Sequence, residues 1–307
     1  MEKRLNRSDL MFSLAFLLML VIAIGAFFYG VKVGTDRAEA GRASEEAVEA
    51  AAATPEPNAY QQQDLVSFYH TVFLSYREFQ NDWLDAQNKW LSDSTADRSA
   101  ALKQLAKTAR HKYDAIKGVY VAPVSPQLKS AQTNYMKSLK LFEEGFSGLA
   151  SSANEGSAQS ALDKIEADSY YKEGLKFALT GQKEYFGSML KWAEAVNADI
   201  PSDVDGLNVI SIADWKDLPL VVKLKASSDF MTEQAALTDY LPHDLAAKVD
   251  QFIASGQAEK RKIKSFNAIA DLLISTEAVT SGYFNEVKSR FYASEQLPQL
   301  PFFSSGK

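Results

Sequence analysis

Histidine is the side chain whose ordinary pKa best suits proton transfer near neutral pH, and it is a common metal ligand. The 307-residue chain contains three, His70, His111 and His243. None has a second histidine or a cysteine three or four residues away, the spacing that brings two ligands together on one helix face. His70 and His111 fall outside the apolar pattern of their segments, and His243 follows Pro242. We therefore expect three solvated surface histidines and no metal or catalytic site.

Nucleophiles and cofactor loops are also missing from the sequence. The chain has no cysteine, which excludes a thiol nucleophile, a disulfide framework and a cysteine-ligated zinc. It has no glycine-rich phosphate loop, no Gly-x-Ser-x-Gly nucleophile turn and no His-Glu-x-x-His helix. We expect no enzyme activity, no catalytic residue, no cofactor and no metal.

Residues 203–206, Asp-Val-Asp-Gly, have the acidic alternation and the glycine found in the middle of a calcium-binding loop. In that register the first ligand position is Pro201 and the twelfth is Ile212, so the first ligand and the bidentate carboxylate are both missing. The segment therefore predicts an ordinary turn.

One cluster of charge could bind a partner. Four cations fall within five residues, at Lys260, Arg261, Lys262 and Lys264. They form a candidate interaction surface for anionic lipid head groups or an anionic polymer, and the alternative is a solvated helix face. The whole chain has 33 Lys and Arg against 39 Asp and Glu, a net charge of -6, so we expect no nucleic-acid partner.

An apolar segment lies near the N-terminus, ahead of the helices that position this cluster. Residues 10–31 contain no charge, and as a helix they reach roughly 33 Å, enough to cross a hydrocarbon core of about 30 Å. They predict a transmembrane signal-anchor helix that binds the lipid bilayer. The alternative is a secreted protein that is cleaved near Ala40, because Ala38-Glu39-Ala40 has the small-x-small form of a cleavage site.

The count of basic residues does not decide the orientation of the span, because equal numbers flank its two ends. These are Lys3, Arg4 and Arg7 before the span and Lys32, Arg37 and Arg42 after it. Since residues 1–9 concentrate their charge beside the span, we expect them to form a cytoplasmic stub. This predicts a single-pass protein of the cell membrane with an extracytoplasmic C-terminal domain. A cytoplasmic domain tethered by its N-terminus is the alternative.

Residues 32–59 are rich in Ala and Glu, end in a Pro-containing stretch, and predict a stalk. From Tyr60 the apolar period is helical, so the fold class is predicted to be all-α. Residues 60–198 are expected to form an antiparallel four-helix bundle. Its helices are predicted over about 62–91, 95–117, from Ser125-Pro126 to about 149, and 158–196.

Two heptad rows suggest how the bundle closes. The last helix carries a row of small residues, and the first helix carries a row of aromatic ones. We expect the aromatic row to fill the groove left by the small row, with the two helices antiparallel. The small row is Gly174, Gly181, Ser188 and Ala195, and the aromatic row is Tyr69, Tyr76, Trp83 and Trp90.

Residues 199–217 predict a connector, and residues 218–296 a smaller helical module packed against the bundle. Its helices are expected from Pro219 to about 241, from Pro242 to Gly256, over about 258–274, and over about 276–293. The extended tail, 297–307, is expected to dock back through Leu300, Phe302 and Phe303.

The sequence favours a membrane-anchored interaction or scaffold domain whose partner is a protein of the cell envelope. The alternative is a ligand-binding, sensor-like subunit with a pocket between helices or between the two helical modules. A pocket of at least about 300 Å³ with convergent polar groups separates the two functions, because a scaffold does not need one.

Overall fold

The computed structural model describes residues 59–201 and 209–303, all within one compact unit, Asn58–Lys307. Apart from an isolated bridge between Ser211 and Ser265, these residues contain helices and loops only, which confirms the all-α prediction for them. Among them, no helix combines the length and apolarity needed to cross a bilayer. The predicted span and Asp203–Gly206 turn, and all of the predicted stalk except its last residue, Ala59, lie outside the described residues.

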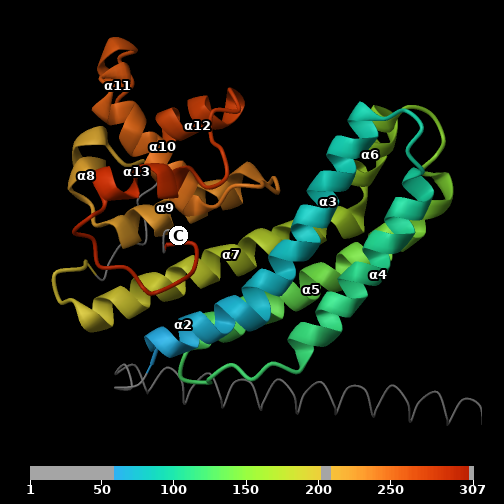
Figure 1. The fold of residues 1–307 in the computed structure, drawn as a ribbon, viewed down its shortest axis with the longest axis horizontal. Helices are drawn as coiled ribbons and strands as arrows, with labels where there is room; N and C mark the ends of the chain where they lie inside the picture. Colours follow the sequence, from blue (N-terminus) through green and yellow to red (C-terminus); the bar gives the residue numbers. More distant parts are fainter. Residues whose placement is uncertain (1–58, 202–208, 304–307) are drawn as a thin grey trace, which may run out of the picture. The chain divides into compact units, whose positions relative to one another are not determined.

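The first half of the unit is a helical bundle (Figure 1). Its first long segment is continuous, with a π-helical stretch near its start, and it buries the aromatic side chains of Tyr76, Trp83 and Trp90. The helices are α2 (Gln62–Phe68), η1 (Tyr69–Phe73), α3 (Leu74–Ser92), α4 (Arg98–Lys117), α5 (Pro126–Leu149), η2 (Ala150–Ser152), α6 (Ala158–Ala167) and α7 (Ser169–Val196).

The predicted helix over 158–196 is wrong as a single element, because the chain breaks between α6 and α7. Asp168 has an extended backbone, and its side chain accepts a hydrogen bond from the Tyr171 amide. This is the N-cap interaction that begins a new helix. α6 is thereby a separate short helix at the tip of the bundle.

The expected partner of the small-residue groove is also wrong. A Cβ at Gly181 would lie 3.0 Å from the ring of Tyr135, and one at Gly174 would lie 3.4 Å from Phe142. Both aromatic residues belong to α5, which runs antiparallel to α7. The small residues therefore allow α5 to approach α7, and the first helix touches α7 at other points, such as Phe68 against Tyr185.

The C-terminal module contains α8 (Ile212–Asp217), α9 (Leu220–Gln234), α10 (Pro242–Ala254), α11 (Gln257–Lys260), α12 (Phe266–Ser275) and α13 (Tyr283–Phe291). Three predicted bounds are wrong. α9 ends at Gln234 because Ala235 is left-handed, with φ 50°. A turn with left-handed Lys262 separates α11 from α12, and α13 begins only after Gly282. Part of the predicted connector, Ile212–Asp217, is helical.

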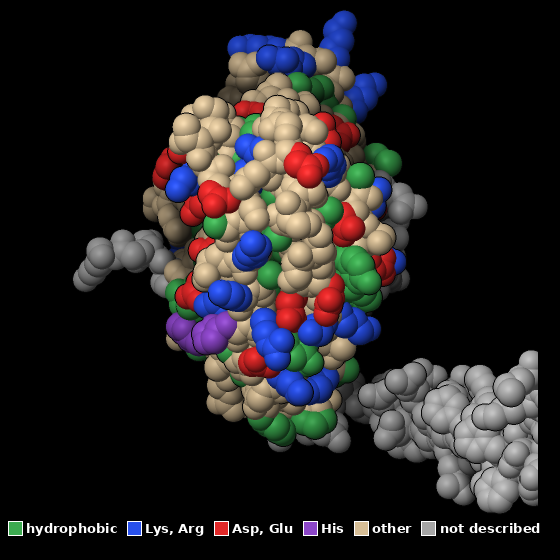
Figure 2. Space-filling model, turned by 90° about the vertical axis from the view of Figure 1, so that its right-hand side faces the viewer, with side chains coloured by type: hydrophobic (Ala, Val, Ile, Leu, Met, Phe, Trp, Pro, Cys, Tyr) green, Lys and Arg blue, Asp and Glu red, His purple; other side chains and the backbone are tan. Residues whose placement is uncertain are grey.

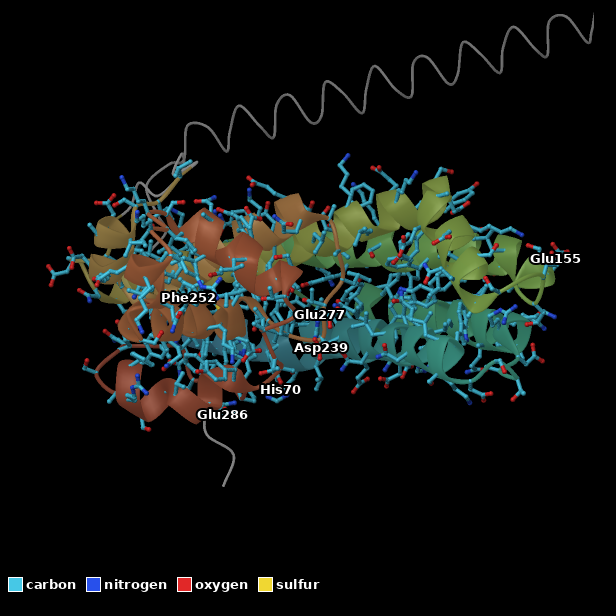
Figure 3. All side chains as sticks on the ribbon, turned by 90° about the horizontal axis from the view of Figure 1, so that it is seen from above. His70, Glu155, Asp239, Phe252, Glu277 and Glu286 are labelled. Carbon is cyan, nitrogen blue, oxygen red and sulfur yellow. The ribbon has the colours of Figure 1, made fainter. Side chains whose placement is uncertain are left out.

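The module and the tail cover the outer face of α7. Thr232 of α9 donates a hydrogen bond to the Leu179 carbonyl, 3.4 Å away, and Lys183 pairs with Asp229 at 3.5 Å. The tail docks by burying Leu300 and Phe303. Figure 3 shows Asp239 in the middle of the unit, between Phe252 of the module and Glu155 at the far tip of the bundle.

Candidate functional site

The predicted basic cluster lies at an extremity of the module. Lys260 ends α11, Arg261 and Lys262 form the turn that follows, and Lys264 precedes α12; all four residues are exposed. Lys and Arg side chains gather at the upper end of the molecule in Figure 2, the end that α11 occupies in Figure 1. The cluster is therefore a turn and not the helix face that the sequence suggested.

The three histidines remain apart. His70 and His111 are exposed, as expected. The prediction for His243 is wrong: its side chain is only 3 % exposed and is enclosed by aromatic rings, because α10 inserts its first turn against the tail. Burial lowers the pKa of His243 to about 4. Within residues 59–201 and 209–303, no three His, Asp or Glu side chains gather in a way that could hold a metal ion.

A groove between the bundle and the module offers a candidate ligand site. It has a volume of about 640 Å³ and is walled by α3, by the end of α6 and the start of α7, and by the end of α9 with the loop that follows. Its lining is Leu84, Gln87, Glu166, Tyr171, Lys172, Leu175, Lys176, Leu179, Thr232, Ala235, Ala236 and Leu237. We call this the interface groove.

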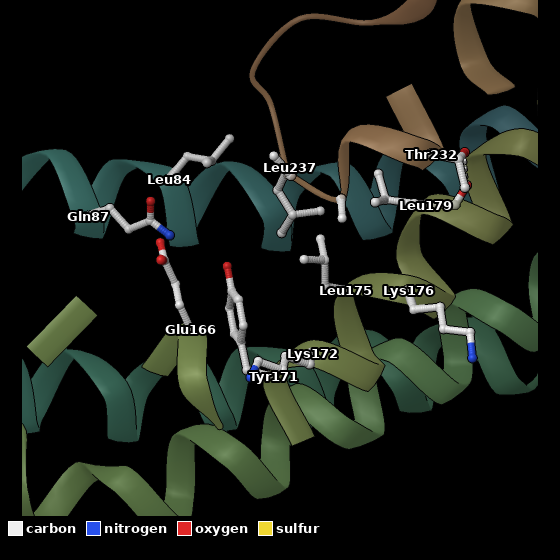
Figure 4. Close-up of a pocket in the computed structure, with 12 residues that line it drawn as sticks. Leu84, Gln87, Glu166, Tyr171, Lys172, Leu175, Lys176, Leu179, Thr232 and Leu237 are labelled. Carbon is white, nitrogen blue, oxygen red and sulfur yellow. Dashed lines mark hydrogen bonds between the residues drawn. The ribbon is translucent and has the colours of Figure 1, made fainter. Parts of the chain in front are cut away.

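The interface groove has an apolar end. Leu175 of α7 and Leu237 of the loop point toward each other across it (Figure 4), and Leu84 and Leu179 complete the surface. Leu179 is buried, while the other three leucines are partly exposed because the groove opens to solvent. This end could take an alkyl chain or a ring by removing apolar surface from water.

The other end of the interface groove is polar. Gln87 of α3, Glu166 of α6 and Tyr171 of α7 converge there in Figure 4. The Trp83 indole donates a hydrogen bond to the Tyr171 hydroxyl, 3.2 Å away, and thereby orients it. Burial raises the pKa of Tyr171, so this hydroxyl is neutral at physiological pH. Glu166 makes no ion pair within the described part of the chain, so its carboxylate is available to accept hydrogen bonds from a ligand.

The loop that closes one side of the groove is held by the bundle. Arg77 of α3 donates to the carbonyls of Thr238 and Asp239, at 3.0 and 2.7 Å, and Gln80 donates to the Thr238 carbonyl at 2.9 Å. Beneath the loop, the Gln182 side-chain nitrogen is buried without a hydrogen-bond partner beside a void of about 10 Å³. The position of Leu237 in the groove therefore depends on Arg77 and Gln80.

The sequence allowed a pocket between the two helical modules as the alternative, but it did not identify the residues of the interface groove. Its residues come from α3, α6, α7, α9 and the loop after Gln234, and this loop was predicted to be helical. Leu84 and Leu175 fit the apolar patterns of their helices. The sequence therefore gives no sign that they line a groove, because the groove forms only when the module packs against the bundle. The one signal in the sequence is the wide apolar face of the helix that carries Leu175 and Leu179, and it does not show that the module covers this face incompletely.

Comparison of the chain with protein-family models, with curated proteins and with solved structures found no match. The interpretation of the site therefore rests on its geometry and chemistry.

Proposed function

We propose that the helical unit is a non-catalytic binding module that holds an amphipathic ligand in the interface groove. The observation that carries this proposal is the groove itself, whose volume of about 640 Å³ lies in the range of about 300–1,000 Å³ typical of small-molecule sites. A pocket with convergent polar groups is the feature that distinguishes a ligand-binding subunit from a scaffold. The geometry thus favours the ligand-binding alternative.

The ligand has an apolar chain or ring and a head that donates hydrogen bonds. The apolar part lies between Leu175 and Leu237, and the head faces Gln87, Glu166 and Tyr171. Because Glu166 and the side-chain oxygen of Gln87 are acceptors, an amine or hydroxyl head satisfies them better than a head that only accepts. Lys172 and Lys176 line the same groove, and Lys176 has Glu173 as a partner at 3.5 Å.

We also propose that residues 10–31 anchor this module in the cell membrane, with residues 1–9 in the cytoplasm and residues 32–59 as a stalk. The uncharged run of residues 10–31 and the absence of an aromatic residue between 32 and 59 support this arrangement. The bundle is proposed to be an antiparallel four-helix bundle over 60–198, joined by the connector 199–217 to the module 218–296.

The groove is tested with N-phenyl-1-naphthylamine, a neutral fluorescent amine with a phenyl ring, a naphthalene ring system and one N–H donor. Residues 58–307 are titrated with the dye after circular dichroism has confirmed their helical content and cooperative unfolding. The unaltered domain is expected to enhance the dye's fluorescence in a saturable way. L175R and L84R place a charge on opposite walls of the groove and are expected to weaken binding about tenfold or more.

The matched control is L91R on α3, because Leu91 is 58 % exposed and does not line the groove. This variant is expected to bind the dye as the unaltered domain does. Absence of saturable binding, or equal loss in all three variants, would contradict the proposal and leave the scaffold function, with a protein partner in the envelope.

The anchor is tested separately with the full chain carrying a C-terminal tag. The protein is expected to stay with membranes after alkaline extraction, and protease added to intact cells is expected to remove the tag. Release into the soluble fraction would contradict the anchor, and a protected tag on membrane-bound protein would contradict the orientation.

A further inference from the structure

The turn that carries the basic cluster has a defined conformation. The amide of Ile263 donates to the carbonyl of Ala258 and the amide of Lys262 donates to that of Glu259, each over 3.0 Å. With Lys262 left-handed at φ 58°, this is the Schellman arrangement that closes a helix. Ala258 is buried beneath it. The four cations are therefore presented by an ordered tip, which we call the basic tip.

The charge of the basic tip is not neutralised within the molecule. Lys260, Arg261, Lys262 and Lys264 are all exposed, and none forms an ion pair with a carboxylate in the described residues. The whole chain has a net charge of -6, so without these four cations the rest of the sequence carries -10. The tip is thus a small positive region on an acidic protein.

We propose that the basic tip binds a linear polymer that carries phosphate groups. A flexible polyanion can contact the tip alone, and its repulsion by carboxylates that lie farther away than a Debye length of about 8 Å is screened. A flat anionic bilayer would also face the acidic surfaces beside the tip. In addition, the described part of the chain begins just before α2, and α11 lies on the opposite side of the unit (Figure 1). The basic tip is therefore on the side away from the point where the proposed anchor and stalk join the unit. This interaction is independent of the ligand in the interface groove.

The test uses the full chain in a phosphatidylcholine nanodisc, immobilised on a sensor, with long-chain inorganic polyphosphate as the analyte. K262G removes one cation and keeps the turn, because glycine favours the left-handed backbone at this position. We expect about fivefold weaker binding for K262G and about a hundredfold weaker binding for the triple variant K260Q/K262G/K264Q. Binding by the unaltered chain is expected to weaken with rising salt, more steeply than binding by the variants.

The control for net charge is K103Q/K107Q, which removes two exposed cations of α4, compared with K260Q/K264Q, which removes two from the tip. Only the second pair is expected to reduce binding. The control for the backbone change is E277G, because Glu277 is also left-handed, with φ 52°, and lies outside the cluster. It is not expected to weaken binding.

Three results would overturn the proposal. They are no binding of polyphosphate by the unaltered chain, the same loss in K103Q/K107Q as in K260Q/K264Q, and capture of phosphatidylglycerol vesicles without binding of polyphosphate. The last result would assign the tip to an anionic bilayer. Since the dye experiment does not involve the tip, failure here leaves the interface groove untouched.

Discussion

The ring of Phe302 stacks on the imidazole of His243, with ring centroids 5.0 Å apart and planes 9° apart. Phe302 also stacks on Phe186 of α7, at 6.2 Å and 24°, so one tail residue joins the module to the bundle. The imidazole is buried, and its Nδ1 atom has no hydrogen-bond partner. Protonation would give the ring a second N–H group, and the buried stack offers no acceptor at Nδ1. This environment therefore favours the neutral form of His243.

His243 should make the protein sensitive to acid. Burial is the main cause that lowers its pKa to about 4; Asp244 opposes this shift and Arg77 adds to it. Because the unfolded pKa is about 6.5, the unfolded chain binds a proton between pH 6.5 and 4 while the folded chain does not. The free energy of unfolding should therefore fall, by roughly 3 kcal/mol, as the pH decreases through this window.

Urea unfolding at several pH values measures this effect. H243Q has no titratable ring and should lose the His243 part of the pH dependence, while H70Q, at an exposed position, should keep it. If H243Q and the unaltered protein show the same slope between pH 6.5 and 4, the buried histidine does not control the acid response.

The close approach of α5 to α7 makes a second prediction. G181A adds a Cβ that would lie 3.0 Å from the Tyr135 ring, which cannot retreat because it is buried and lies 4.4 Å from Tyr76. We expect a loss of about 1–3 kcal/mol in stability. G148A is the matched variant, since a Cβ there meets nothing within 4 Å, and it should gain about 0.5–1 kcal/mol from helix propensity. Thermal or urea unfolding of both measures the difference, and destabilisation by both would argue against steric contact as the cause.

Arg77 should control the loop beside the interface groove. R77M removes the donors to the Thr238 and Asp239 carbonyls and should cost about 3 kcal/mol or more, since two hydrogen bonds from a charged group are lost and each is worth about 1.5–3 kcal/mol. The Leu241 amide, which donates to Asp244, should then exchange its hydrogen faster. Hydrogen exchange with mass spectrometry measures this, and R110M on the bundle surface is the control. Unchanged exchange at Leu241 in R77M would show that the loop holds its place without Arg77.

The sequence was sufficient to predict features that depend on local chemistry. Ser125-Pro126 gave the start of α5, and Pro242 gave the start of α10, because a proline in the first helical turn loses no hydrogen bond. Heptad spacing identified Tyr76, Trp83 and Trp90 as core residues. Docking of the tail was predictable because Leu300 and Phe303 are apolar side chains that can be removed from water only by packing against the helices.

Features that depend on long-range contact were not predictable in the same way. The π-helical stretch Tyr69–Phe73 lies inside an otherwise regular pattern. The left-handed residue that ends α9 is Ala235, where a glycine would have given a signal. His243 follows a proline that opens a helix, and its burial comes from Phe186, Phe284 and the tail, all distant from it in the sequence. The interface groove is likewise formed by segments distant in sequence.

The most direct test of ligand binding uses the absence of cysteine from the chain. L237C places a single thiol in the interface groove, and Y120C places one at a position that is 79 % exposed and is not part of the groove lining. The rate of labelling by a polar maleimide is measured with and without N-phenyl-1-naphthylamine. With the dye at ten times its dissociation constant, labelling of L237C should slow about tenfold, while Y120C should react unchanged. An unchanged rate at L237C under saturating dye would contradict the claim that the groove is the binding site.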